Sequence, residues 1–281
     1  MGAVTSRKDF MKGDIEMEER DSLDRDYEVF SSKRFEDIII FRFKENLLYR
    51  ATELGSKATV LNYLSRVSES DTIKVVVIMG SPQETGLREY VQFYRQVLEL
   101  GFDQSALQRA YNTIDQFILK ILDLNKIVIH ADSRRVISLF LNVSLACDYR
   151  IVTDNTVFQK LHLELGLVPK GGCTFFLSKM LGMSKAAGIL LSSKDITAQE
   201  AMRLGMVDKV VPLDKVEETA LKIAQYFTQK PARSLTGVKR LLNYPMDDLR
   251  NYLEFENEEL FKIVASSEFK EKLAEYTEGR L

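Results

Sequence analysis

Apolar residues follow two patterns along most of the chain, short unbroken runs and longer stretches with helical spacing. The clearest run is Val75 to Met79, which ends at Gly80. Such a run is typical of a strand buried on both faces. The stretch 29–43 is predicted as a hairpin, with its turn near Ser32-Lys33. Further strands are predicted at residues 127–129, 149–152 and 207–211.

Stretches with apolar residues three and four positions apart separate these strands. The longest spans residues 87–123, which we expect to be helical, and Ile114, Phe117 and Ile121 mark its apolar face. Shorter helices are predicted at residues 59–68 and 139–146. Because strand and helix alternate, the pattern predicts crossover connections and a largely parallel sheet.

The two ends of the chain differ from this alternating part. Residues 1–26 are rich in charge of both signs and poor in apolar periodicity, so we expect a flexible tail. Residues 213–281 contain helical patterns only. The prediction is therefore an α/β core at 27–212, followed by a helical region at 213–281 that packs on itself or on a neighbouring subunit.

Composition narrows the functional class. The 281 residues carry 39 Lys and Arg against 41 Asp and Glu, so we expect no nucleic-acid partner. No apolar stretch approaches the roughly 20 residues of a membrane span. Two cysteines and two histidines are too few for a disulfide framework or a structural zinc site. We therefore expect a cytoplasmic protein with no metal and no membrane partner.

Three motifs follow one another within residues 144–212. They are ACD-x-R-I from Ala146, LGL-x-P-x-GG-x-T from Leu165, and A-x-EA-x-x-x-G-x-V-x-x-VVP ending at Pro212. Together they resemble the enoyl-CoA hydratase/isomerase (crotonase) family, and the similarity extends over about residues 27–281. The resemblance implies a crotonase-like spiral of ββα units with a C-terminal helical trimerisation region. It also implies homotrimers, often paired into hexamers.

The resemblance also implies a ligand. Family members bind acyl thioesters, usually of coenzyme A (CoA), without a covalently bound cofactor. Two backbone N–H groups form an oxyanion hole for the thioester enolate, and one such donor contributes about 3 kcal/mol. By resemblance the donors here are Gly86, Leu87 and Leu139. Lys239 and Arg240 fall where relatives bind CoA phosphates, although exposed helix charges are an equal interpretation.

The residues that depart from the family pattern stand at the positions that carry out the chemistry in relatives. Ser138, Leu139 and Phe140 stand where relatives have three glycines, and Asn142 stands at the catalytic glutamate position. His162 stands at the position of the second glutamate. Hydration needs one group to activate water and another to deliver a proton. An asparagine exchanges no protons at neutral pH, so ordinary alkene hydration is not expected.

Three polar residues are candidates for the remaining chemistry. His162 is a candidate general base, because the unperturbed pKa of a histidine, about 6.5, suits proton transfer; a hydrogen-bonded histidine of the pocket or the core is the alternative. Glu164 shares its face if the segment is extended, and is otherwise a surface or inter-subunit carboxylate. Asn142 either orients a water or a carbonyl, or satisfies a neighbouring group.

Two functions remain open. The first is a divergent acyl-thioester enzyme with isomerase, hydrolase or decarboxylase chemistry. The second is a catalytically inactive relative with a binding or scaffold role. The bulk of Leu139 and Phe140 favours the second, and the retained LGLVPKGG segment favours a surviving pocket. An open pocket joining Leu87, Leu139 and His162 would support the enzyme, whereas a Phe140 side chain filling it would support the scaffold.

Overall fold

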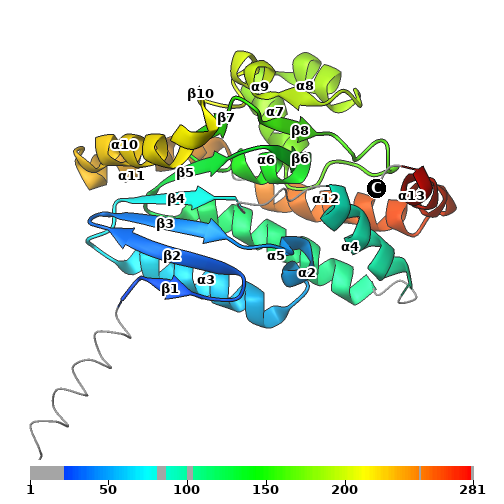
Figure 1. Ribbon diagram of the computed structural model, residues 1–281, viewed down its shortest axis with the longest axis horizontal. Coiled ribbons are helices and arrows are strands. Elements are labelled where there is room, and N and C mark those ends of the chain that lie inside the picture. The colour runs from blue at the N-terminus through cyan, green and yellow to red at the C-terminus, as the bar shows by residue number, and fades with distance from the viewer. Residues whose placement is uncertain (1–21, 81–86, 100–103, 247, 280–281) are drawn as a thin grey trace, which may run out of the picture.

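A seven-stranded sheet forms the centre of the protein in a computed structural model that describes residues 22–80, 87–99, 104–246 and 248–279 (Figure 1). The strand order is β1-β2-β3-β4-β5-β7-β10. The first three strands pair antiparallel and the remaining pairs are parallel. The strands are β1 (Arg25–Asp26), β2 (Phe30–Phe35), β3 (Ile38–Phe43), β4 (Val75–Met79), β5 (Ile127–Asp132), β7 (Tyr149–Thr153) and β10 (Lys209–Val211).

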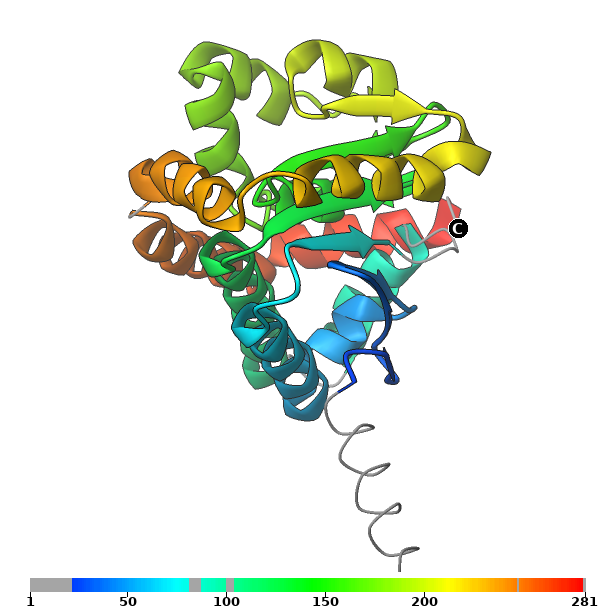
Figure 2. The same cartoon turned by 90° about the vertical axis from the view of Figure 1, so that its left-hand side faces the viewer.

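Helices cover both faces of this sheet. In Figures 1 and 2, α10 lies over one face, and α3 and α5 lie on the other. The helices before the C-terminal region are α2 (Leu47–Ala51), α3 (Leu54–Glu69), α4 (Leu87–Glu99), α5 (Gln104–Asp123), α6 (Ser138–Ser144), α7 (Cys173–Leu181), α8 (Met183–Leu190) and α9 (Ala198–Leu204). The C-terminal helices are α10 (Val216–Thr228), α11 (Ala232–Asn243), α12 (Leu249–Val264) and α13 (Ser267–Gly279), with 3₁₀ turns at Leu213–Lys215 and Tyr244–Met246.

The central strands are buried on both faces, as the run at residues 75–79 predicts. Val75 and Val77 pack in one cluster with Ala220 and Ala224 of α10. Val76 and its neighbours on the opposite face pack in a second cluster with residues of α3 and α5. Successive side chains of a strand point to opposite faces, so one apolar run supplies both clusters. The prediction of an α/β fold with a largely parallel sheet is confirmed.

The hairpin near the N-terminus differs from its prediction. Its turn lies at Glu36-Asp37 and not at Ser32-Lys33, which pair with β3. Glu36 has a positive φ of 53°, a conformation that suits a tight turn. Within β1, Arg25 and Asp26 pair with β2, so the sheet begins inside the predicted tail. The rest of that tail, residues 1–21, lies outside the described residues.

A second, three-stranded sheet was not predicted. It contains β6 (Arg135–Ile137), β8 (Val157–Gln159) and β9 (Ile196–Thr197). β6 runs directly into α6, because Ile137 ends the strand and Ser138 begins the helix. Leu139 at the start of α6 lines the same pocket as Ile78 of β4 and Asp132 of β5.

Candidate functional site

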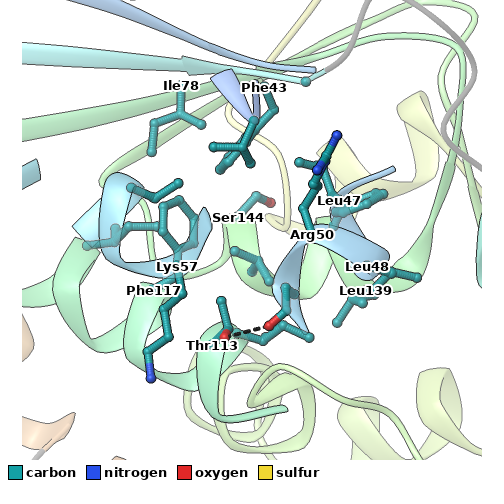
Figure 3. Close-up of a pocket in the computed structure, with 18 of the residues that line it drawn as sticks. Phe43, Leu47, Leu48, Arg50, Lys57, Ile78, Thr113, Phe117, Leu139 and Ser144 are labelled. Carbon is teal, nitrogen blue, oxygen red and sulfur yellow. Dashed lines mark hydrogen bonds between the residues drawn. The ribbon is translucent and has the colours of Figure 1, made fainter. Parts of the chain in front are cut away.

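A deep pocket lies between the sheet and helices α2, α3, α5 and α6 (Figure 3). It has an empty volume of about 1020 Å³, counted with its open mouth. Phe43 and Ile78 reach into it from the sheet, and Phe117 reaches in from α5. Other apolar residues that line it are Val29, Leu47, Leu48, Ala51, Val60, Leu61, Ile114, Ile121, Leu139, Phe140, Val143 and Cys147. A largely apolar cavity with a few polar groups suits a small-molecule ligand.

Two polar side chains that line the pocket, Arg50 and Thr113, are already paired within the protein. The guanidinium of Arg50 contacts Glu28 at 2.6 Å and Glu53 at 3.2 Å. The hydroxyl of Thr113 donates to the main-chain oxygen of Ala51 over 2.8 Å, which ties α5 to α2 (Figure 3). These contacts fix the helices that form the outer wall of the pocket.

Two titratable side chains of β5, His130 and Asp132, line the inner wall. They lie on the same face of the strand, and His130 Nε2 is 3.8 Å from Asp132 Oδ2. Burial raises the pKa of Asp132 to about 7, against the hydrogen bond from the Ser133 N–H. Burial and the nearby positive charge of Arg150 lower the pKa of His130 to about 4. The sequence analysis did not single out these two residues as a site.

The predicted oxyanion residues Leu139 and Leu87 lie in different helices. Leu139, the second residue of α6, is buried and lines the pocket, and half-buried Phe140 lines it without closing it. Leu87 begins α4. Gly86 lies outside the described residues.

Asn142 is bound within the protein. Its Nδ2 donates to the main-chain oxygen of Lys170 over 2.9 Å, and the residue is only 2% exposed. The contact joins α6 to the LGLVPKGG segment. In that segment Gly171 has φ 93°, and a Cβ there would lie 3.3 Å from Asn142 Cβ, so a glycine is required.

His162 lies away from the pocket. Its Nε2 is 3.2 Å from the main-chain oxygen of Leu190, and burial lowers its pKa. The flanking residues Leu161 and Leu165 pack in one cluster with Leu139 and with aromatic residues of α4. Among the described residues that line the pocket, neither His162 nor half-buried Glu164 is present. The structure therefore does not bring Asn142, His162 and Glu164 together at the pocket.

A buried charge network holds the LGLVPKGG segment, and the sequence analysis missed it. Lys170 Nζ contacts the carboxylates of Asp115 on α5 and Glu256 on α12, the latter at 3.1 Å. Glu256 also accepts the Gly171 N–H at 2.8 Å and the Gly172 N–H at 3.0 Å. Burial raises the pKa of both carboxyl groups, and Lys170 opposes that shift. Only the fold reveals this network, because its members are far apart in sequence.

The two basic residues of α11 have different environments. Lys239 is only 3% exposed, and its ammonium donates to the Ile121 and Lys126 carbonyls and to Asp148, at 2.9, 3.0 and 2.9 Å. It therefore points into the protein, in contrast to the surface position expected for a CoA ligand. Arg240 is exposed.

The sequence profile of the enoyl-CoA hydratase/isomerase family matches residues 56–281. The chain belongs to that family. A short-chain-enoyl-CoA hydratase from Clostridium acetobutylicum is 30% identical over 139 residues, which are 49% of this chain and 53% of the hydratase. The match thus spans about half the length of that relative. A trans-2-decenoyl-[acyl-carrier-protein] isomerase from Streptococcus mutans is 23% identical over 79% of this chain and 84% of its own length.

Solved structures in the family share the fold. The enoyl-CoA hydratase from Bacillus halodurans superposes with a TM-score of 0.75 at 19% identity, over 88% of this chain and 99% of that one. Among the described residues, no helix is long and apolar enough to cross a membrane. In the same part of the chain, no three His, Cys, Asp or Glu side chains come together as a site for a metal ion.

Proposed function

We propose that the chain binds an acyl thioester, such as an acyl-CoA, with the acyl group in the apolar pocket. One observation carries the proposal: the start of α6 lines a deep apolar pocket. The family resemblance places an oxyanion donor at this helix. The first N–H groups of a helix have no acceptor within that helix, and Leu139 is the second residue of α6. With Leu87 and Gly86, its amide is the proposed oxyanion donor.

The proposed chemistry is an enolate reaction of the isomerase, hydrolase or decarboxylase kind, without a covalently bound cofactor. Two-glutamate hydration is disfavoured, because Asn142 stands at one glutamate position and His162 at the other. Both side chains are buried and hydrogen-bonded. Purified protein is therefore expected to hydrate crotonyl-CoA no faster than buffer does.

The second candidate function is a catalytically inactive binding or scaffold protein. It is favoured by one observation: Asn142, His162 and Glu164 do not line the pocket. Turnover of any acyl thioester would exclude it. Loss of that turnover in His162→Ala would assign the chemistry to His162, and turnover that survives would move it elsewhere.

Self-association is proposed through the C-terminal helical region. Leu241 and Leu242 of α11 are 78% and 68% exposed, and Tyr244 beyond it is 74% exposed. Apolar side chains grouped in this way commonly mark a protein interface. A trimeric mass by light scattering, reduced to a monomer in Leu241→Glu/Leu242→Glu, would support this assembly.

The binding proposal is tested by closing the pocket. Ala51 lines it, so Ala51→Phe fills part of the space, whereas Ala187→Phe makes the same change at an exposed position of α8. Hexanoyl-CoA should raise the melting temperature of wild type and Ala187→Phe but not of Ala51→Phe. A ligand at about 100 times its Kd stabilises by roughly 2.7 kcal/mol. No shift in wild type would contradict the proposal.

A further inference from the structure

The inner wall of the pocket carries a buried pair, His130 and Asp132, within an otherwise apolar strand. β5 is buried along its whole length, and strands of this kind are ordinarily apolar on both faces. On the face toward α10 the strand is apolar, with Ile129 and Ala131. The two polar residues alternate with them and face the pocket.

The surrounding chain makes room for the carboxylate of Asp132. Gly80 follows β4 and donates its N–H to the Ala131 carbonyl at 3.2 Å. A Cβ at Gly80 would lie 2.7 Å from Asp132 Oδ1, closer than real Cβ contacts allow. The Ser133 N–H donates to the same oxygen at 2.8 Å. Within the part of the chain that the structure describes, Asp132 Oδ2 shows no such bond, and it lies 3.8 Å from His130 Nε2, beyond hydrogen-bond distance.

His130 does not neutralise this carboxylate. Arg150 on β7 lies opposite His130 in the sheet register, and its positive charge disfavours a second cation there. His130 Nδ1 has no hydrogen-bond partner among the described residues. Near neutral pH the imidazole of His130 is therefore uncharged and does not form an ion pair with Asp132.

We propose that Asp132, held beside His130 on the pocket wall, transfers protons to and from the bound acyl thioester. The assignment rests on the proposed function, since it requires the acyl group in this pocket. It places the proton-handling group on β5, away from the Asn142 and His162 positions. A carboxyl group that is half ionised near the working pH is well suited to accept and return a proton.

The reaction that needs only one such group is an allylic proton shift. The Asp132 carboxylate takes a proton from C2 of a 3-enoyl thioester, and the electron pair of that C–H bond delocalises into the thioester carbonyl. The resulting carboxylic acid returns the proton to C4, which leaves a 2-enoyl thioester. No water, oxidant or reductant is consumed, and the carboxylate is regenerated.

The charged groups around Asp132 define its pH response. His130 and Arg150 lie nearest to it in the sheet. Arg42 on β3, Arg134 after β5 and Glu217 on α10 line a second cleft that Asp132 also borders. Arg50 and Lys57 line the pocket together with Asp132. Arg42 and Glu217 are paired at 2.8 Å, and Arg50 is paired with Glu28 and Glu53. The activity is therefore expected to rise with pH around neutrality, as Asp132 ionises.

The test measures isomerisation of 3-hexenoyl-CoA in D₂O by mass spectrometry, beside calorimetric binding of hexanoyl-CoA. Asp132→Asn should lower kcat by roughly 100-fold or more and abolish deuterium incorporation, with hexanoyl-CoA binding retained. Gly80→Ala, which displaces the carboxylate without removing it, should lower kcat in the same direction. Asp154→Asn, at an exposed aspartate directly after β7, is the matched control and should leave kcat unchanged.

The outcomes separate the two proposals. Wild type that binds no acyl-CoA would overturn both of them. Wild type that binds hexanoyl-CoA but neither isomerises nor exchanges protons would overturn the role of Asp132 alone. Asp132→Asn with wild-type turnover and an unchanged pH profile would do the same. Loss of turnover and of the pH response near neutrality, with binding intact, would support it.

Discussion

The side-chain amide of Asn142 donates a 2.9 Å hydrogen bond to the main-chain carbonyl of Lys170. The bond is buried and joins α6 to the glycine-containing segment before α7. At the position where the family resemblance predicts a catalytic glutamate, Asn142 thus acts as a structural donor. An ionised carboxylate in its place could only accept hydrogen bonds and would face a carbonyl oxygen.

Asn142→Ala should therefore destabilise the protein by about 1–3 kcal/mol, because the Lys170 carbonyl is left buried without this donor. Asn142→Asp should cost at least as much. Urea unfolding measures both. Asn251→Ala, at an exposed position of α12, is the control and should stay within about 0.5 kcal/mol of wild type. An Asn142→Ala variant as stable as this control would show that the hydrogen bond does not contribute to the stability of the fold.

Glu256 is expected to be a strong determinant of stability. Glu256→Gln removes a charge from the buried contact with Lys170 and should cost about 3 kcal/mol in urea unfolding. Glu259→Gln on the same helix breaks only an exposed pair with Lys262, so its expected cost is below about 1 kcal/mol. Equal costs for the two variants would contradict a buried network that holds the LGLVPKGG segment.

The raised pKa of Asp132 predicts a pH-dependent stability. Its folded pKa of about 7 lies above the ordinary value of 3.8, so between these values the folded state binds a proton more readily than the unfolded state. Wild type therefore loses stability from Asp132 as the pH rises through this window. His130 contributes the opposite trend at the acid end, between about 4 and 6.5, because its pKa is lowered.

Asp132→Asn isolates the carboxylate, because asparagine does not titrate. Relative to wild type, the variant should gain up to about 4 kcal/mol between about pH 4 and about pH 8. Urea unfolding at several pH values measures this difference. A difference that does not change with pH would mean that water reaches the carboxylate in the folded protein.

Lys239 and Arg240 are adjacent in sequence, but substitutions at the two positions are expected to have different effects on stability and on acyl-CoA binding. Lys239→Met leaves two carbonyls and Asp148 without their buried donor and should cost about 3 kcal/mol of stability. Arg240→Met should leave stability unchanged and should weaken acyl-CoA binding if this helix contacts the CoA phosphates. Unfolding and calorimetry on both variants separate the roles. A Lys239→Met variant with full stability would contradict the structural assignment.

The sequence predicted the elements that follow a strong apolar pattern. The run at residues 75–79 is β4, since a strand buried on both faces needs apolar residues at every position. The hairpin turn was misplaced because Ser32-Lys33 has the polar composition of a turn. In the structure Lys33 is exposed, whereas Ser32 is buried and its hydroxyl donates to the Leu23 carbonyl at 2.8 Å. β8 and β9, of three and two residues, are too short to produce a periodic signal.

The candidate site was only partly predictable. Leu139 was identified because it stands in the segment where relatives have three glycines, and it does line the pocket. Glu256 gave no signal, because its partners Lys170 and Gly171 are more than eighty residues away along the chain. Asp132 was not among the candidate residues. Its importance depends on burial and on the pocket beside it, and neither can be derived from a single sequence.

The central claim is that an acyl-thioester pocket persists in this chain, and calorimetric titration tests it most directly. The titrations use free CoA and butyryl-, hexanoyl- and octanoyl-CoA. Burial of each methylene contributes about 0.8 kcal/mol, so affinity should rise roughly fourfold per methylene until the pocket is full. Equal affinity for free CoA and octanoyl-CoA, or no binding of either, would contradict the account.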